Sequence, residues 1–343
     1  MPNLTLMDWA RRVDPDGTVP LIADLLSQTN EILTDMVMMQ GNLPTGHRCT
    51  IQTGLPTVYY RALNQGIGTS KGNTVQVDEG CAMAEAWSEV DVDLAMLNGN
   101  TAEFRLSEAR MFLEAMNQTI ANGLFYGNPA AVPTQFLGLQ HRYSDQAAGN
   151  AQNIIDGLGN TAFMQTSVWL VCWGDNTTFT IFPKGSTAGL LQEDLGKSTS
   201  YDTGSGTGTR MRVWTEHFQW KIGLVVKDWR SVVRICNLDT TDFFDLSEEQ
   251  APSGFEHLIH LMVKAMARIP KGIYSQSRPV FYMNRSAQTL LERLALEKSN
   301  QAVTVTTATD QFGRAVNEMR FRGIPIRQCD AILNTEDVVP AAP

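Results

Sequence analysis

The sequence predicts an α+β protein with more than one lobe. Segments with helical periodicity and segments of alternating, β-branched residues are interleaved without the regular βαβ order of a parallel sheet. The chain of 343 residues is long enough for two or three lobes and contains no internal repeat. Charged residues make up only 18% of the chain, which is low for a soluble domain and favours an oligomer with much covered surface.

The overall charge and the cysteines narrow the class of protein. A net charge of −9 argues against a general nucleic-acid binder, which would carry a basic face. There is no run of about 18 apolar residues to span a membrane, and no basic and then apolar secretory signal at the N-terminus. The cysteines are odd in number, far apart and without a CxxC pair, which predicts reduced thiols in a cytosolic protein: Cys49, Cys81, Cys172, Cys236 and Cys329.

Residues 1–45 are expected to form an arm with helical pieces. Thr18 can cap a helix that has Pro20 in its first turn, and apolar residues then recur at helical spacing as far as Gly41 and Pro44. A short helix this apolar needs a partner, inside or outside its own subunit.

Residues 46–97 predict a long β-hairpin and its return strand. β-rich stretches at 57–63 and 74–80 flank the sequence GIGTSKGNT, whose glycines suit a tight turn. Apolar and acidic residues alternate from 90 to 94, so the return strand is expected to continue through this stretch.

Residues 100–125 predict the longest helix. Asn100 can cap it, with Glu103 three residues on as in a capping box, and Gly123 offers a C-terminal stop. Roughly 24 helical residues at about 1.5 Å each give a length of about 36 Å, enough to cross a whole domain as a strut. One apolar stripe follows its length: Phe104, Ala109, Phe112, Leu113, Met116 and Ile120.

The remaining chain alternates between strands and helices. A loop at 127–143 holds two prolines, and 202–210 is a Gly/Ser/Thr-rich surface loop. Residues 186–196 are expected to be a short helix or loop, and a break at Gly223 divides 211–238 into two strands. Further strands are predicted at 167–174, 178–183, 278–284, 301–308 and 319–333, and further helices at 254–268 and 285–298.

The stretch Gly68-Thr69-Ser70-Lys71-Gly72 matches the G-x-S-x-G pattern of a serine-hydrolase nucleophile elbow. An elbow requires a strand, a sharp turn and then a helix, whereas a strand follows here. A Walker phosphate loop would need Gly-Lys followed by Ser or Thr and a helix, and neither follows. A hairpin tip is therefore the favoured interpretation, and a hydrolase that uses Ser70 is the weak alternative.

No other group of residues predicts a catalytic, cofactor-binding or metal site. His257 and His260 lie at i, i+3, not at the i, i+4 spacing of a zinc protease, and are expected to cap or pack. The glycines of 202–208 depart from GxGxxG, and their Asp-Thr-Gly triplet is too short to indicate an aspartic protease. One acidic set resembles a carboxylate cluster: Glu85, Glu89, Asp91 and Asp93. Alternation sends Asp91 and Asp93 to the solvent face of a strand, so a solvated face is the favoured interpretation.

The order of these parts resembles the major capsid protein of tailed bacteriophages, with its Hong Kong 97-type fold. Three phrases are also similar to that family: GLFYGNPAAVPTQFLGL (123–139), TIFPKGSTAGLLQEDLG (180–196) and NEMRFRGIPIRQCDAILNTE (317–336). The resemblance covers nearly the whole chain and implies a structural protein without catalytic, cofactor or metal residues. An encapsulin-like nanocompartment shell, which shares the fold and encloses enzymes, is the alternative.

The resemblance divides the chain into named parts. It implies an N-terminal arm at 1–45, an extended E-loop hairpin at 46–97, a peripheral (P) domain at 98–149 and 266–343, and a mostly axial (A) domain at 150–265. The E-loop tip that would contact another subunit contains Gly66, Gly68, Ser70, Lys71 and Gly72. The spine helix would pack through Phe104, Phe112 and Met116, and candidate hinges are Gly127, Pro129 and Pro133.

The resemblance also implies partners and a location. Copies of the chain would form hexamers and pentamers of an icosahedral shell around double-stranded DNA, without sequence-specific binding and without a membrane. The shell would be part of the virion and would assemble in the cytoplasm of the bacterial host. Portal and decoration proteins are further partners, and the N-terminal Met implies a separate scaffold protein or none. Some relatives cross-link subunits from an E-loop lysine to an asparagine, and Lys71 could be the first of that pair.

Overall fold

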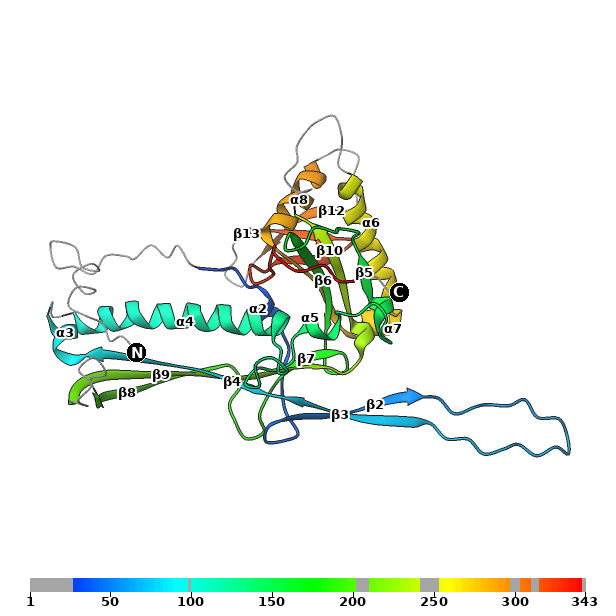
Figure 1. Ribbon diagram of the computed structural model, residues 1–343, viewed down its shortest axis with the longest axis horizontal. Helices are drawn as coiled ribbons and strands as arrows, with labels where there is room; N and C mark the ends of the chain where they lie inside the picture. Colours follow the sequence, from blue (N-terminus) through cyan, green and yellow to red (C-terminus); the bar gives the residue numbers. More distant parts are fainter. Residues whose placement is uncertain are drawn as a thin grey trace.

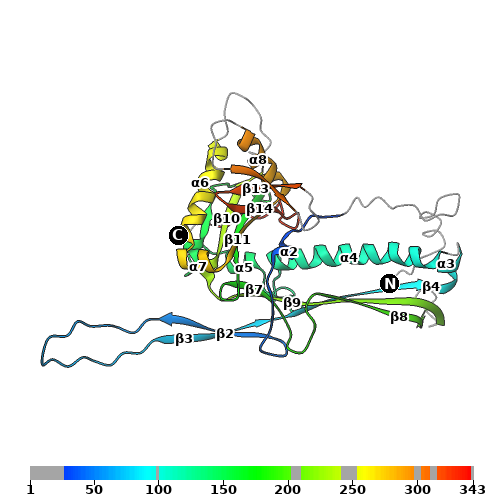
Figure 2. The ribbon, with the colours of Figure 1, turned by 180° about the vertical axis from the view of Figure 1, so that it is seen from behind.

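The computed structural model describes residues 27–97, 100–201, 210–240, 253–296, 303–309 and 315–340. The chain forms a lobe with two long extensions that leave it in opposite directions (Figures 1 and 2). One extension is a two-stranded hairpin, and the other is a long helix lying along a sheet. This mixture of helices and sheets confirms the predicted α+β class.

The lobe is built around strand β6 (Gln165–Trp173), in which every residue is buried. Because side chains alternate along a strand, Val168, Leu170 and Cys172 enter one core while Trp169, Val171 and Trp173 enter another. Antiparallel strands pair with β6 on both sides, namely β10 (Val232–Asp239) and β11 (Arg278–Met283). A strand that is apolar on both faces requires cover on both faces, and the lobe provides it.

Two layers of helices supply this cover. One face of β6 packs against α6 (Ser253–Arg268) and α8 (Arg285–Leu296). The other face packs against α2 (Ile32–Asp35), α5 (Leu139–Arg142) and the end of the long helix. Strand β5 (Ile154–Asp156) lies beside β10. Beyond β11 the sheet continues with β14 (Ile324–Gln328), β13 (Ala315–Phe321) and β12 (Val303–Thr309). The last lobe element is the short helix α7 (Lys271–Gln276).

The long helix α4 (Thr101–Tyr126) lies along a three-stranded sheet of β4 (Ala82–Asp91), β9 (Arg210–Val226) and β8 (Leu190–Tyr201) (Figure 1). The predicted stripe faces this sheet and the lobe: Phe104 is buried in a cluster with Val90, and Phe112 stacks on Phe218 with ring centroids 5.6 Å apart. Met116 is buried beside Phe218. Strand β7 (Thr178–Phe182) pairs with β9, with the end of β6, and with β1 (Met38–Gln40), and so joins this sheet to the lobe.

The structure corrects the predicted hairpin. The partner of β3 (Asn73–Gly80) is β2 (Gly46–Gly54), not the stretch 57–63, which has no regular structure. The residues 57–63 have high β-propensity, but propensity reflects packing on a half-buried surface, and every residue from 55 to 72 is exposed.

The return strand ends earlier than predicted. Strand β4 stops at Asp91, and a short helix, α3 (Val92–Met96), follows. The Asp91 carboxylate accepts hydrogen bonds from the backbone N–H groups of Asp93 and Leu94, so Asp91 is a helix cap and not a solvated strand residue. The alternation of acidic and apolar residues from 90 to 94 therefore covers a strand end and the first turn of a helix, and not a continuing strand.

Three glycine or loop predictions were also wrong. Helix α4 continues past Gly123 and ends before Gly127. The stretch 186–196 contributes to β8, an edge strand that pairs with β9. Strand β9 runs through Gly223, where a Cβ would lie 2.6 Å from the carbonyl oxygen of Gly80, so this glycine permits a close approach instead of ending a strand. The break between β9 and β10 falls at residues 227–231.

Other predictions are confirmed or lie outside the described residues. Helix α6 and strand β11 match their predicted ranges, and the Asn284 side chain accepts a hydrogen bond from the backbone of Ser286 at the start of α8. Asn100 precedes α4, but its side chain bonds to the Glu103 carboxylate and not to the backbone. The helix expected to start near Thr18 and the glycines of 202–208 lie outside the described residues.

The predicted domain edges can be placed on this architecture. The edge at 149/150 follows α5, and the edge at 265/266 falls inside α6. Residues on both sides of the second edge share one core, since β11 pairs with β6 and α6 packs beside α8. The division into named P and A domains stays a prediction.

A buried ion pair joins four parts of the lobe. Arg234 on β10 donates from Nη2 to Glu336 Oε2 (2.8 Å), and both side chains are almost fully buried. Arg234 also donates to Ser167 Oγ (3.1 Å) and to the carbonyl oxygen of Tyr143 (2.9 Å). The Tyr126 hydroxyl at the end of α4 donates to Glu336 Oε1 (2.5 Å). The C-terminal segment is thereby tied to β6, β10 and the long helix.

The described residues contain no helix that is both long and apolar enough to cross a membrane.

All cysteines are free, and burial raises the pKa of the Cys172, Cys236 and Cys329 thiols to about 12 and that of Cys81 to about 11. These thiols are therefore protonated and unreactive at neutral pH.

Candidate functional site

The hairpin of residues 46–80, here called the projecting hairpin, extends away from the body of the molecule (Figures 1 and 2). At its root, Arg142 on α5 makes two parallel hydrogen bonds to the Glu79 carboxylate, of 2.6 and 2.7 Å. The same guanidinium donates to the carbonyl oxygen of Leu224 on β9 (3.1 Å). Since both charged groups are largely buried and the pairing is bidentate, this contact fixes the hairpin to the body.

The middle of the hairpin is a regular antiparallel ribbon. Across the two strands, Arg48 donates from Nε and Nη2 to the Asp78 carboxylate, both at 2.6 Å. The hydrogen bond from Arg48 lowers the pKa of Asp78, and the same bond raises the pKa of Arg48. Both groups are solvent-exposed, so we expect this pair to add little stability. The ladder becomes irregular between Gln52 and Gly54, where the strands give way to the tip.

The tip of the hairpin, residues 55–72, is uncovered and contains several large apolar side chains. Within it, a single backbone–backbone hydrogen bond joins Gln65 to Ala62 (3.3 Å). The exposed fractions of its large apolar side chains reach 82% for Leu55, 89% for Val58, 108% for Tyr60 and 91% for Leu63. Scattered exposed apolar residues are normal, whereas several of them on one projecting arm are typical of a surface that contacts another molecule.

Ser70 lies in this tip, where its hydroxyl donates to the carbonyl oxygen of Thr57 (2.7 Å). The strand β3 follows it, so the helix that a nucleophile elbow requires is missing. This arrangement gives no support to the hydrolase alternative. Lys71, Gly66, Gly68 and Gly72 are all exposed in the same tip, as predicted for residues that contact another subunit; that contact itself stays a prediction.

We expect loss of the root contact to loosen the projecting hairpin. Replacing Arg142 with Ala leaves the Glu79 carboxylate largely buried without its partner, which costs about 3 kcal/mol by analogy with other buried pairs. Hydrogen exchange of β2 and β3 should accelerate and the urea midpoint should fall. Arg48→Ala is the matched control, because it removes an exposed pair on the same ribbon and should leave both measurements near the wild-type values. Equal effects of the two variants would contradict the assigned root.

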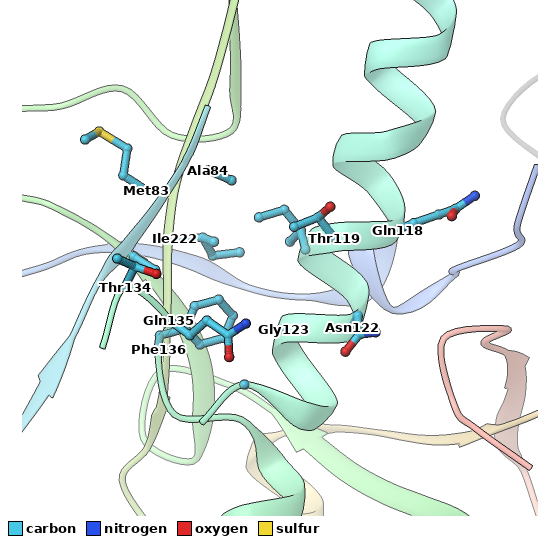
Figure 3. A pocket seen from close by; sticks show the side chains of 13 residues that line it. Met83, Ala84, Gln118, Thr119, Asn122, Gly123, Thr134, Gln135, Phe136 and Ile222 are labelled. Carbon is cyan, nitrogen blue, oxygen red and sulfur yellow. The ribbon is translucent and has the colours of Figure 1, made fainter. Parts of the chain in front are cut away.

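A groove lies beside the root, between the second half of α4 and the start of β4 (Figure 3). Its volume is about 490 Å³. The floor is apolar, with Phe136, Ile120 and Ile222 almost fully buried. Polar but uncharged side chains form the rim: Gln118, Thr119, Asn122, Thr134 and Gln135. The groove thus suits a neutral, mainly apolar occupant that also needs hydrogen-bond partners.

The wall of this groove contains one of the candidate hinges. Gly127 ends α4, and a Cβ there would lie 2.4 Å from the carbonyl oxygen of Phe136 and 2.6 Å from that of Gly123. Gly127 is buried, whereas Pro129 is half-buried and Pro133 is exposed in the loop that follows. These two carbonyl oxygens leave no room for a side chain at position 127, so close packing alone explains the glycine. Hinge motion at these three residues stays a prediction.

The other candidate residues are not gathered into one site. His260 is exposed on α6, and the side chain of His257 lies outside the described residues. Glu85 lies near His217 on β9 (3.8 Å), and Glu89 accepts a hydrogen bond from Ser200. Among the described residues, no group of three or more His, Cys, Asp or Glu is placed to hold a metal ion.

Sequence reasoning missed both the root contact and the groove. Arg142 and Glu79 are 63 positions apart, and the groove combines segments from four parts of the chain. The glycine-rich phrase that ends α4 was a usable signal, since Gly123, Gly127 and Gly138 allow the chain to fold tightly against Phe136 and the helix end.

A rigid root, a regular ribbon and an uncovered apolar tip define a structural protein that assembles with other molecules. The chain belongs to the family of major capsid protein GP7, whose profile matches residues 14–340. It is therefore a structural protein of a phage head, and the resemblance to the Hong Kong 97-type capsid proteins is confirmed.

One solved structure supports this assignment, and two others are more distantly similar. A chain of bacteriophage Epsilon15 is similar with a TM-score of 0.75 and 29% identity, covering 99% of this chain and 98% of that one. The capsid of bacteriophage JBD30 is similar with a TM-score of 0.44 and 10% identity, over 90% and 93%. The SrpI encapsulin of Synechococcus elongatus gives a TM-score of 0.40 and 10% identity, over 69% and 97%. The last two are too distant to support an argument. No curated protein matches the chain.

Proposed function

We propose that this chain forms the icosahedral head of a tailed phage, in which rings of six and of five copies enclose double-stranded DNA. The observation that carries this proposal is the uncovered apolar tip of the projecting hairpin. The tip cannot contact the body of its own chain, because the ribbon carries it away from the lobe and from α4 (Figures 1 and 2). A neighbouring copy is the partner that a self-assembling shell provides.

The mechanism is mechanical. A shell that resists the pressure of packed DNA must tie each subunit to several neighbours. The projecting hairpin laid across the next copy buries apolar side chains at about 1.5–3 kcal/mol each, and α4 with its sheet transmits force across the subunit as a strut. Each contact joins different surfaces on the two copies, and such contacts form a ring where the rotation from one copy to the next closes.

The charge of the chain fits a container for DNA. A net charge of −9 opposes tight adhesion of the shell to nucleic acid. Several arginines of the body are also occupied by carboxylates of the same chain, including Arg105 with Glu216 and Arg278 with Asp35. Portal, scaffold and decoration proteins are the further partners of this proposal, and assembly takes place in the cytoplasm of the bacterial host.

Expression of the chain followed by negative-stain electron microscopy tests the proposal. Icosahedral particles, tubes or polyheads are the expected result. A monodisperse monomer at high concentration would refute it. Virions that contain the chain should release nuclease-sensitive double-stranded DNA. Particles that hold protein cargo and no DNA would instead support the nanocompartment alternative.

A further inference from the structure

We propose that the exposed face of helix α6, together with the start of α7, binds the phosphate backbone of the DNA that the shell encloses. This surface, here called the basic stripe, consists of His260, Lys264, Arg268 and Lys271. The inference rests on the proposed function, because it requires a shell filled with DNA. It goes further by assigning the part of the subunit that contacts the DNA.

The basic stripe lies in a part of the chain that has no acidic residue. Between Glu256 and Glu292 there is no Asp or Glu, although the whole chain contains 36 of them and has a net charge of −9. A local excess of positive charge in an acidic chain is typical of a surface that binds a polyanion. The Lys and Arg residues of this stretch are Lys264, Arg268, Lys271, Arg278 and Arg285.

Helical spacing places the basic stripe on one face of α6. His260, Lys264 and Arg268 recur at i, i+4 and i+8, and all three are exposed. Helix α6 lies at the edge of the lobe away from α4 (Figures 1 and 2). The core of the lobe holds the opposite face of the helix and so fixes the stripe toward the outside, through Leu258, Leu261, Met262 and Ala265.

The Lys and Arg side chains of the basic stripe have no anionic partner in the described part of the chain. Lys264, Arg268 and Lys271 form neither an ion pair nor a side-chain hydrogen bond with any residue that the structure describes. By contrast, Arg278 in the same stretch pairs with Asp35 at 3.2 Å. The helix dipole favours Arg268 in the last turn of α6, but it disfavours Lys271 in the first turn of α7. An anion from another molecule can satisfy all three cations.

The basic stripe fits a nucleic acid better than a protein. Among the described side chains of α6 and α7, Tyr274 is the one large apolar group that is exposed, at 37%. The core of a protein–protein interface is apolar and poor in charge, whereas interfaces with DNA are polar and positively charged. Lys264 and Arg268 lie one turn apart, about 6 Å along the helix axis. A duplex has one negative charge per about 1.7 Å of its length, so the stripe can meet phosphates at any sequence.

Salt-dependent DNA binding by isolated subunits tests the stripe. The triple variant Lys264→Gln/Arg268→Gln/Lys271→Gln is compared with the wild-type chain by fluorescence anisotropy of a labelled duplex, below the protein concentration at which particles form. The slope of log K against log salt concentration should become shallower by about 2.7, since each lost phosphate contact removes about 0.9. Circular dichroism should show an unchanged fold, because the three side chains are exposed.

A second triple variant separates the position of the cations from their number. Arg61→Gln/Lys71→Gln/Arg110→Gln removes three exposed cations from other parts of the chain and gives the same net charge. This control should keep the wild-type slope. An equal change of slope in the two variants would show that net charge alone matters and would overturn the assignment of the stripe.

Amine labelling of wild-type particles tests the contact in the assembled shell. Lys264 and Lys271 should react several-fold more slowly in DNA-filled particles than in particles emptied of DNA, whereas the exposed Lys184 serves as the internal reference. Equal protection in filled and emptied particles would show that protein covers the stripe, and full reactivity in both would show that nothing does. Either result would overturn the inference and leave the proposed function intact. Particles without DNA would refute the proposed function itself.

Discussion

Replacing Val58, Tyr60 and Leu63 together with Asp is expected to abolish particle formation while the subunit stays folded. These side chains are 89%, 108% and 91% exposed, so they contribute nothing to the core of their own chain. Between copies, burial of three large apolar side chains would contribute several kcal/mol per contact. Charges at the same positions would have to be desolvated instead, which reverses the sign of the contact.

Electron microscopy and sedimentation measure the loss of particles, and circular dichroism measures the retained fold. A second triple variant controls for charge alone: Thr57→Asp, Gln65→Asp and Thr69→Asp put three new carboxylates on polar positions of the same tip. This control should still assemble, with only a modest rise in the protein concentration at which particles form. Normal particles from the apolar-to-Asp variant would remove the tip from the proposed mechanism.

Replacing Arg234 with Met is expected to lower the free energy of unfolding by about 3–5 kcal/mol, because the Glu336 carboxylate remains buried without its cation. Glu336 still receives hydrogen bonds from Tyr126 and Ser167, but neither neutralises its charge. The effect should be large because Arg234 and Glu336 join strand β10 to the C-terminal segment inside a covered lobe.

Urea denaturation of the unassembled triple-Asp tip variant measures this effect on isolated subunits. The double variant Arg234→Met/Glu336→Gln removes both charges and should lose less than the single variant. Arg230→Met is the control, because Arg230 forms an exposed pair with Asp228 and should change the stability by about 1 kcal/mol or less. A midpoint for Arg234→Met equal to that of the control would show that the pair is dispensable.

The sequence was informative wherever one local pattern decided the structure. The stripe from Phe104 to Ile120 is long and regular enough to specify both the helix and its buried face. The apolar run at 167–174 specified a strand, although only the structure shows that its odd and even residues enter different cores. The errors lie where neighbouring segments determine the structure. Residues 190–196 form part of a strand because β9 lies beside them, whereas 57–63 makes no ladder of backbone hydrogen bonds with another segment.

The candidate site was predictable only in part. The position of the tip followed from its glycines and the strands around it. The strand β2, which leads into the tip, could not be predicted in this way, because it is defined by its pairing with β3 and not by its composition. The Arg142–Glu79 contact and the groove depend on the path of the chain between distant segments, for which a single sequence carries no local signal.

The exposed tip has a consequence for the kinetics of assembly. If each tip is covered by the next copy, as proposed, every copy of an open row but the last has its tip covered, so one tip is always in water. The copy that closes the ring covers its own tip and that of its neighbour, and gains two contacts for the translational freedom of one molecule. Short open rows should therefore be rare relative to closed rings, and particle formation should show a lag and a sharp threshold in protein concentration.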